Sequence, residues 1–352
     1  MKVLGLVPFN IIPANFGGAE RALNLLAALG GIKTLALNWE LDFETTYRGM
    51  TYQAINADPE AHEQANKIFG QAVYTMDGIP AFTKDKQKKL KAAIADYAPD
   101  LIVLDHPWLY PFVGDTPFIY DAHNAEAFLT SLRWPGSIDE QIVRELEEAA
   151  VTNAKAITYC SELDAQILRQ TYNPTAPMHY VPNGTDLPSK LAEGKSKNLV
   201  FIGSNYGPNV RAAQALADHA PDNYTVQILG LCADRVRTNR PNVELIGYVD
   251  NDTMERYLLN AHAFVNLMQT GSGTSLKVAR AMSYGLPVIS SKVGARGYEG
   301  VVVLDDVSYL APALDHVAED WAGYSDKSRA YAEKISWVGV GATFAQITYA
   351  EI

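Results

Sequence analysis

The sequence is short of cysteine and has no apolar run long enough to cross a membrane. Its two cysteines, Cys160 and Cys232, lie far apart and have no metal-binding spacing, which excludes a zinc site and indicates a reducing compartment. The first apolar run breaks at Pro8 and lacks a small-residue cleavage site, so a strand is expected there rather than a signal peptide. Short-period repeats and low-complexity tracts are missing as well. These absences predict a globular, cytoplasmic protein.

Acidic residues outnumber basic ones, and the formal net charge of −11 argues against a broad nucleic-acid surface. Residues 83–94 depart from this balance, and their apolar members recur at helical spacing, which predicts a helix with one basic face. One interpretation is a solvated surface helix. The other is a patch for peripheral contact with an anionic membrane or for a polyanionic acceptor, modified DNA included. The basic face comprises Lys84, Lys86, Lys88, Lys89 and Lys91.

Short runs of Val, Ile and Leu alternate with amphipathic segments along the 352 residues. Such runs are typical of parallel strands buried on both faces, so the alternation predicts an α/β fold with doubly wound sheets. The order restarts once, after a polar link near residues 183–197 that contains Pro and Gly. We therefore expect two Rossmann-like domains facing across a cleft, at residues 1–183 and 184–335. A closing helix is expected at residues 336–352.

The segment GSGTSLK, residues 271–277, joins a predicted strand to a predicted helix. Gly271 and Gly273 let the backbone come close to a ligand, and the hydroxyls of Ser272, Thr274 and Ser275 add donors. The free N–H groups of the first helical turn, the helix dipole and Lys277 favour an anion. A diphosphate fits this chemistry. The alternative is a plain glycine turn in which Ser272 or Thr274 caps the helix.

A second pair of glycines, Gly17 and Gly18, follows the first predicted strand and precedes a helix expected to begin near Ala19. A loop of this kind can approach a phosphate or a sugar, and a tight turn is the alternative. In the segment VDND, Asp250 and Asp252 superficially resemble a divalent-metal motif. Because a helical pattern follows directly, a helix N-cap is the interpretation that we favour.

Polar and aromatic side chains follow two successive predicted strands of the first half, in LDHPWLYPF and FIYDAHNAEAF. Carboxylates, histidines and an aromatic ring suit sugar hydroxyls, through charge-assisted hydrogen bonds and stacking. None of them has the spacing of a metal triad. The group consists of Asp105, His106, Trp108, Asp121, His123, Asn124 and Glu126.

Taken together, these segments resemble the GT-B glycosyltransferases, specifically the retaining family 4-like group. YDAHNAEAF is similar to that family's His-Asn-x-Glu segment, and FIGSNYGPNVRAA to the opening of its second domain. IGYVDNDTMERYLLNA resembles its nucleotide-binding strand and helix, VPNGTDL its interdomain strand, and SWVGVGATFAQI its returning C-terminal helix. GSGTSLKVARAMSYGLPVISSKVGARG resembles its donor loop. The matches follow the family's order over nearly the whole chain.

The resemblance implies a retaining hexosyl- or pentosyltransferase that needs neither a metal nor another cofactor. It places the acceptor in the first domain and a nucleotide-diphosphate sugar in the second, with the closing helix packed back on the first domain. The acceptor is a glycan, a lipid-linked sugar or another hydroxyl. The implied catalytic residues are His123, Lys277 and Arg280, and the acceptor residues are His106, Trp108, Asn124 and Glu126. The donor residues are Gly17, Gly18, Gly203, Ser204, Asn209, Arg211, Tyr248, Val249, Ser272, Gly273, Thr274 and Ser275.

Some positions depart from the family pattern. Arg280 stands where the family has a glutamate that contacts the ribose, and Ser204 and Val210 stand where it has Arg and Lys. The phosphate charge then falls to Lys277, Arg280 or Arg211. Two alternatives therefore stay open beside the transferase. One is a catalytically impaired relative that binds nucleotide-sugars or glycans, and the other is a GT-B-like sugar-nucleotide epimerase.

Overall fold

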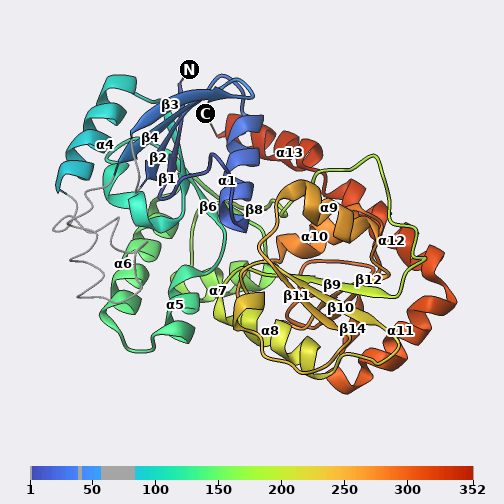
Figure 1. Cartoon of the computed structure of the whole chain (residues 1–352). Coiled ribbons are helices and arrows are strands. Elements are labelled where there is room, and N and C mark those ends of the chain that lie inside the picture. The colour runs from blue at the N-terminus through green and yellow to red at the C-terminus, as the bar shows by residue number, and fades with distance from the viewer. Residues whose placement is uncertain (1, 39–41, 57–83, 352) are drawn as a thin grey trace. The chain divides into compact units, whose positions relative to one another are not determined.

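The computed structural model describes residues 2–38, 42–56 and 84–351. Contacts group the chain into two compact units, each built around its own sheet (Figure 1). The first unit consists of residues 1–182 and 338–352, and the second of residues 183–337. Within the described part of the chain, no helix is both long enough and apolar enough to span a membrane.

The first unit contains an eight-stranded sheet in the order β3-β4-β2-β1-β5-β6-β7-β8. All neighbouring strands run parallel except β3 and β4, which form an antiparallel edge hairpin. The central strands β1, β5 and β6 are buried on both faces, as their continuous apolar runs predict. The strands are β1 (Val3–Val7), β2 (Lys33–Asn38), β3 (Phe43–Tyr47), β4 (Met50–Asn56), β5 (Leu101–Asp105), β6 (Phe118–Ala122), β7 (Ala156–Tyr159) and β8 (Met178–Tyr180).

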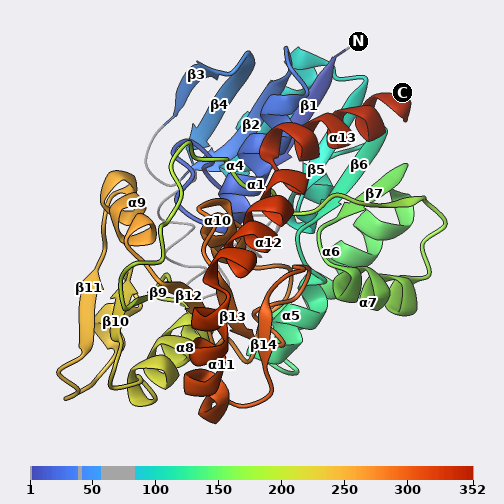
Figure 2. The same cartoon turned by 90° about the vertical axis from the view of Figure 1, so that its right-hand side faces the viewer.

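Helices cover both faces of this sheet. On one face, Leu90, Leu109, Val151 and Leu168 contribute to a core with side chains of the strands. Those four residues lie on α4 (Lys84–Tyr97), the 3-10 helix η1 (Pro107–Phe112), α6 (Ile138–Asn153) and α7 (Glu162–Tyr172). On the other face, the C-terminal helix α13 (Trp337–Ala350) lies beside α1 (Gly17–Ala28), as both views show (Figures 1 and 2). Gly341 of α13 permits this approach, because a Cβ there would lie 2.6 Å from Cβ of Ala28. The closing helix therefore returns to the first unit, as predicted.

The second unit has a six-stranded, fully parallel sheet in the order β11-β10-β9-β12-β13-β14. Its strands are β9 (Asn198–Ile202), β10 (Thr225–Leu229), β11 (Val243–Gly247), β12 (Ala263–Asn266), β13 (Val288–Ser291) and β14 (Val302–Leu304). Parallel neighbours require crossover connections, and helices supply them on both faces. One core forms with α8 and α11, and the other with α9, α10 and α12.

The connecting elements of the second unit are α8 (Gly207–Asp218), η2 (Ala233–Arg235), α9 (Asn251–Leu259), α10 (Leu276–Ser283), η3 (Val307–Tyr309), α11 (Leu310–Glu319) and α12 (Trp321–Lys334). Asp250 caps α9 by accepting a hydrogen bond from the N–H of Thr253 at 2.7 Å, so the N-cap interpretation of VDND is confirmed. Two parallel α/β units, one after the other, are the predicted Rossmann-like pair.

In the first unit, one element was not expected from the sequence, and part of the predicted basic face lies outside the described residues. The β3–β4 hairpin falls in a segment whose sequence carries no recognised signature. The predicted basic helix is present as α4, and Lys88, Lys89 and Lys91 are exposed on it. The side chains of Lys84 and Lys86 lie outside the described residues.

Candidate functional site

Strands β5 and β6 end side by side, which brings two carboxylates together at the carboxyl edge of the first sheet. Asp105 pairs with Asp121 in the strand register. His106 follows β5 directly and has a positive φ of 64°, a conformation that is uncommon for a residue with a Cβ. His123 likewise follows β6 directly. The sheet therefore places two acids and two histidines within one small region, as the spacing of the motifs predicts.

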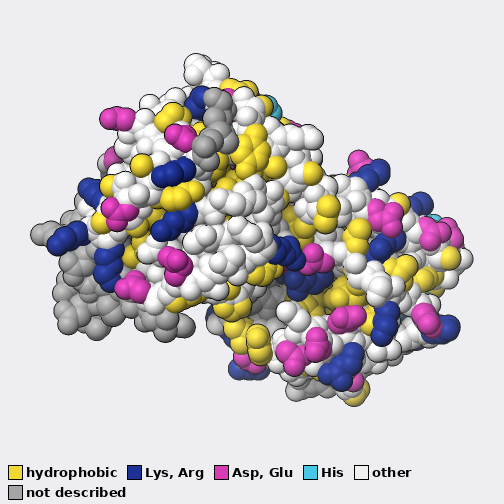
Figure 3. All heavy atoms as spheres, turned by 90° about the horizontal axis from the view of Figure 1, so that it is seen from above, with side chains coloured by type: hydrophobic (Ala, Val, Ile, Leu, Met, Phe, Trp, Pro, Cys, Tyr) yellow, Lys and Arg dark blue, Asp and Glu magenta, His cyan; other side chains and the backbone are white. Residues whose placement is uncertain are grey.

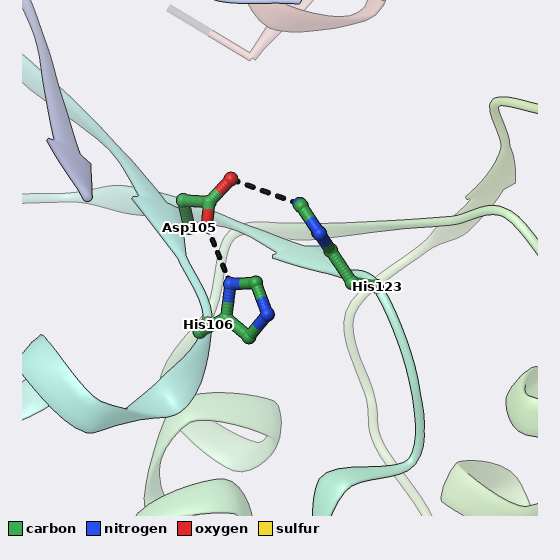
Figure 4. A group of neighbouring side chains, drawn as sticks. All are labelled: Asp105, His106 and His123. Atoms are coloured by element: carbon green, nitrogen blue, oxygen red, sulfur yellow. Dashed lines mark hydrogen bonds and ion pairs between the residues drawn. The ribbon is translucent and has the colours of Figure 1, made fainter. Parts of the chain in front are cut away.

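The two histidines share Asp105 (Figure 4). Nε2 of His123 lies 2.9 Å from Oδ2 of Asp105, and Nδ1 of His106 lies 2.5 Å from Oδ1 of the same carboxylate. His123 Nε2 also lies 3.2 Å from Oδ2 of Asp121. The imidazole ring centroids are 4.2 Å apart, and the His123 side chain is only 6% exposed. His123 is thus held by two buried carboxylates.

These carboxylates control the charge of His123. Burial alone would lower its pKa, but the charges and hydrogen-bonding oxygens of Asp105 and Asp121 raise the pKa to about 9. The pKa of Asp105 is correspondingly lowered by the two histidines, in spite of its burial. At neutral pH the His123 ring is therefore a cation. Its other nitrogen, Nδ1, then carries a proton and can act as a hydrogen-bond donor.

A buried arginine, Arg21 of α1, completes this network. Its Nε and Nη2 donate to the two oxygens of Asp121 at 3.1 and 2.7 Å, and the side chain is 1% exposed. Its Nη1 donates to the carbonyls of Val181 and Pro182, at 2.9 and 3.2 Å. Burial favours the neutral form of Asp121, but Arg21 and His123 hold the pKa of that carboxyl well below its usual range. Two acids therefore face two cations, Arg21 and His123.

Sequence reasoning did not select Arg21. Its partner Asp121 lies 100 residues away, and no local pattern shows that pairing. The available signal was a charged residue on the apolar face of the helix that follows Gly17 and Gly18. Such a residue is almost never fully buried unless it is paired.

The predicted Gly17–Gly18 loop lies beside His123. The helix α1 begins at Gly17, two residues earlier than expected, so both glycines belong to its first turn. A Cβ on Gly18 would lie 3.5 Å from Nδ1 of His123 and 3.0 Å from the ring of Phe16. Glycine therefore keeps space open next to the nitrogen of His123 that does not face the carboxylates.

Asp105, His106 and His123 also form a group whose donor atoms are close enough to hold a metal ion. The hydrogen bonds and charges favour another interpretation. Metal binding would require Nε2 of His123 to lose its proton. That proton is held between two carboxylates, and Arg21 already neutralises part of their charge. The same atoms therefore already take part in an internal network of ion pairs.

The remaining residues predicted in this region lie around His106 and the start of α5 (Glu126–Arg133). The ring of Trp108 stacks on that of His106, with the ring centroids 4.5 Å apart. Nδ2 of Asn124 donates to Oε1 of Glu126 at 2.8 Å. The same oxygen of Glu126 lies 3.5 Å from Nε2 of His106. His106, Trp108 and Glu126 are buried. The structure therefore brings the four predicted acceptor residues together, with one face of Trp108 occupied by His106.

Glu147, which sequence reasoning did not select, caps α5 from the neighbouring helix. It accepts from the N–H of Glu126 at 2.6 Å and from that of Ala127 at 3.1 Å. Tyr172 donates to it at 3.0 Å. Burial and the nearby charge of Glu126 raise the pKa of Glu147 to about 8.

In the second unit, Lys277 lies in the first turn of α10. Its Nζ donates to Oδ1 of Asn209 at 2.5 Å, lies 3.8 Å from the sulfur of Met268 and sits 4.6 Å from the centre of the Phe201 ring. Among the residues that the structure describes, no carboxylate pairs with this ammonium. Loss of hydration lowers its pKa to about 7, although Cys232 opposes the shift.

The loop before α10 has the predicted glycine geometry. Gly271 and Gly273 have φ values of 146° and 67°, which favour glycine. Thr274 is bound by Asn183, whose Nδ2 donates to Oγ1 at 2.9 Å. Ser275 stands at the N-cap position, but its side chain makes no capping hydrogen bond. The N-cap position is therefore Ser275, and not Ser272 or Thr274 as the alternative interpretation had it.

Other predicted donor residues lie beside Asn209, the partner of Lys277, or beside the loop before α10. Nδ2 of Asn209 donates to Oγ of Ser204 at 3.1 Å. A Cβ on Gly203 would lie 2.9 Å from Cβ of Asn209, so glycine is needed for this packing. On the loop side, Arg211 donates to Thr270 at 3.0 Å.

Three further predicted residues of the second unit have other neighbours. Arg280 contacts the sulfur of Met254 on α9 at 3.5 Å. Tyr248 is 77% exposed at the end of β11, and Val249 packs on the core beneath α9 and α10. Their assignment to catalysis or donor binding stays a prediction.

Comparisons with known proteins bear on both units. The family model described as Glycosyltransferase Family 4 matches residues 52–188, and the model described as Glycosyl transferases group 1 matches residues 191–320. No curated protein matches the sequence. The two family models together cover most of both units.

Solved structures of glycosyltransferases have the same fold over almost the entire chain. Sucrose-phosphate synthase from Thermosynechococcus elongatus superposes with a TM-score of 0.76 at 14% identity, covering 99% of both chains. HepE from Anabaena, in complex with UDP-glucose, gives 0.68 at 14% identity and covers 99% of this chain and 100% of its own. The E. coli trehalose-6-phosphate structure bound with UDP-2-fluoro glucose gives 0.68 at 13% identity, with 99% of both chains covered. With both family models in agreement, the chain belongs to the group 1 glycosyltransferases and has the GT-B fold.

Proposed function

We propose that the protein transfers a sugar from a nucleotide-diphosphate sugar to an acceptor hydroxyl, with retention of anomeric configuration and without a metal ion. The observation that carries the proposal is Lys277, a cation that lies in the first turn of α10 and has no acidic partner among the described residues. Helix N-termini attract anions, and a desolvated ammonium lacking a counter-ion is stabilised by one. A diphosphate supplies that charge.

The leaving group in this reaction is a nucleoside diphosphate, on which negative charge grows as the bond to the sugar breaks. Preorganised donors and cations stabilise such charge most when water is excluded. Lys277, the hydroxyls of the Gly271–Ser275 loop and the first-turn N–H groups of α10 supply these donors. In a retaining, front-face route, the departing phosphate also accepts the proton of the acceptor hydroxyl.

His123 acts in this scheme as a hydrogen-bond donor to the reacting sugar and not as a general base. The two carboxylates at Nε2 keep the ring protonated, and a protonated imidazole has no lone pair with which to accept a proton. Its donor is the Nδ1–H group beside Gly18. Arg21 is a positioning residue, because it acts through Asp121.

A uridine diphosphate sugar is the first donor to test. HepE from Anabaena and the E. coli trehalose-6-phosphate structure were solved with UDP-glucose and UDP-2-fluoro glucose, respectively. The acceptor we propose is a glycan, a lipid-linked sugar or another hydroxyl compound. His106, Trp108, Asn124 and Glu126 are its proposed neighbours.

The experiment compares the binding of UDP and of uridine by calorimetric titration, in the wild type and in Lys277→Ala. One charge-assisted contact to a desolvated phosphate is worth roughly 1.5–3 kcal/mol. The substitution should therefore weaken UDP binding about tenfold to a hundredfold, since about 1.4 kcal/mol corresponds to one decade. Uridine has no phosphate, and its affinity should hardly change. The helix should survive, because alanine is the better helix former.

The exposed Lys197→Ala provides a matched control in the same unit and should leave both affinities unchanged. Similar losses for UDP and uridine in Lys277→Ala would place Lys277 away from the phosphates. Transfer is then tested with a panel of UDP-sugars. Tight UDP binding without transfer or donor hydrolysis would favour the impaired relative, and interconversion of the sugar without transfer would favour the epimerase.

A further inference from the structure

The turn that follows β13 lies against the Gly271–Ser275 loop at three successive residues. Nη1 of Arg296 donates to the carbonyl of Gly271 at 3.2 Å and to that of Gly273 at 3.5 Å. The hydroxyl of Tyr298 donates to the carbonyl of Ser275 at 2.8 Å. Between these two residues, Gly297 leaves room for Thr274, whose Cγ2 would lie only 2.6 Å from a Cβ at that position. The turn Arg296–Gly297–Tyr298 thus follows the loop along most of its length.

This arrangement addresses an intrinsic weakness of the loop. Gly271 and Gly273 permit backbone conformations that other residues avoid, but glycine also loses the most conformational freedom when it becomes ordered. Hydrogen bonds from a charged donor are stronger than those between neutral groups. Arg296 therefore holds the two glycine carbonyls in place where the loop would otherwise be least restrained.

Arg296 brings a charge as well as hydrogen bonds. It forms no ion pair with any residue in the described part of the chain, and its guanidinium donates to the two glycine carbonyls. A cation that is not neutralised, next to a loop proposed to bind a diphosphate, favours the binding of an anion. The loop shape and the local potential thus depend on the same side chain.

We propose that Arg296 is a positioning residue of the donor site, which with Gly297 and Tyr298 fixes the Gly271–Ser275 loop in the shape that receives the diphosphate. This inference rests on the proposed function only for the identity of the ligand. The fixing of the loop itself is a property of the protein without ligand, and it can be measured separately.

The test uses Arg296→Ala, the milder Tyr298→Phe, and Arg240→Ala as a matched control. Arg240 also donates to backbone carbonyls of the second unit, those of Asp218 and Ala220, but it lies in a different loop. Backbone order parameters of Gly271 and Gly273, from nitrogen-15 relaxation of the unliganded protein, report on the loop. Arg296→Ala should lower both, and Arg240→Ala neither.

Calorimetric titration then separates positioning from general stability. Arg296→Ala should weaken UDP binding about tenfold, or about 1.4 kcal/mol, with uridine affinity unchanged. Tyr298→Phe, which removes one hydrogen bond and little volume, should show a smaller loss in the same direction. Should Arg296→Ala fail to fold, Tyr298→Phe carries the test alone.

Unchanged order parameters and unchanged UDP affinity in Arg296→Ala would overturn the inference. Equal losses for UDP and uridine would overturn it as well, because they would indicate a purely structural role. If the wild type bound no UDP while Arg296→Ala still loosened the loop, the proposed function would be the part that fails, and the restraint of the loop by Arg296 would stand.

Discussion

Asp121 contacts two cationic side chains, Arg21 and His123, and these contacts bear on the charge of His123. Arg21 occupies both oxygens of Asp121, and Thr158 donates to one of them at 2.7 Å. Asp121 is therefore held still by groups that do not titrate near neutrality. Asp105 instead contacts both histidines, and its charge raises the pKa of His123.

The first residue-scale prediction concerns pH. The pKa of His123 is raised to about 9 from an ordinary value of about 6.5, so the charged ring stabilises the fold. That contribution is fully present below pH 6.5 and is lost as the pH rises through 9. Asp105→Asn removes one of the two charges that raise this pKa, and the pKa of His123 should fall toward its ordinary value. NMR titration of the imidazole resonances measures the shift directly.

If His123 is a donor to the sugar, activity must follow the same titration. The alkaline limb of the pH–rate profile should move to lower pH in Asp105→Asn, and His123→Ala should reduce turnover far more than UDP affinity. A companion variant, Arg21→Lys, tests the positioning role of Arg21. An ammonium cannot reproduce the bidentate contact of the guanidinium with Asp121. An unchanged limb together with a shifted His123 pKa would show that the His123 proton plays no part in the reaction.

At the scale of elements, the strands and helices were the predictable part. The apolar runs at β1, β5 and β6 contain Val, Ile and Leu buried on both faces, and such runs are readable without any knowledge of the fold. The β3–β4 hairpin was not predicted, because its edge strand Phe43–Tyr47 is largely exposed and polar. The local sequence pattern therefore does not predict an edge strand that is exposed to solvent.

The sequence also did not predict which residues of different elements contact each other. The motifs identified His123 and Lys277, each of which stands in a recognisable local segment. Arg21 and Arg296 were missed, because the sequence shows a residue type but not the partner that it reaches across the sheet edge. Arg296 lies 25 residues from Gly271, and only the parallel pairing of β12 with β13 makes them neighbours.

Helix α4 carries the element-scale prediction. Lys88, Lys89 and Lys91 are exposed, and the ion pair of Lys89 with Asp42 is exposed on both sides. Exposed ion pairs contribute about 0–1 kcal/mol. Reversing the three charges to Glu should therefore leave the Tm nearly unchanged, while binding to anionic vesicles or polyanions should be lost. Vesicle co-sedimentation and a melting curve of the same variant provide the two readouts.

The matched control reverses Lys190, Lys195 and Lys197, which are exposed in the second unit and change the net charge equally. In the view of Figure 3, acidic side chains are mixed among the basic ones, so net charge alone is a poor guide to where an anion binds. Equal effects of the two triple variants would assign any binding to overall charge. A wild type that binds neither vesicles nor polyanions would leave α4 as a solvated helix.

At the scale of the whole molecule, the chain passes between its two units at two places that are joined to each other. The first is at residues 182–183 and the second at residues 337–338. The N–H of Thr185 donates to the carbonyl of Ile335, and the N–H of Trp337 donates to the carbonyl of Thr185, both at 3.0 Å. The ring of buried Trp337 covers Gly184 so closely that a Cβ there would overlap its six-membered ring.

The prediction at this scale is that Gly184→Ala destabilises the protein by overpacking the junction. Inserting a methyl group into a packed site costs about 1–3 kcal/mol, because the indole of Trp337 must shift and strain the two hydrogen bonds of Thr185. Urea unfolding should show a lower midpoint, whereas Gly207→Ala should have little effect. A Cβ at Gly207 would meet only the flexible end of Arg211, at 3.4 Å.

A double-mutant cycle shows whether Trp337 is the cause. Trp337→Leu removes the ring and has its own cost, but in that background Gly184→Ala should cost clearly less than it does in the wild type, because the methyl group then has space. Residues in contact commonly show coupling of about 0.5–3 kcal/mol. If Gly184→Ala is equally costly in both backgrounds, its effect comes from the backbone at Gly184 and not from the ring, and the junction does not depend on this contact.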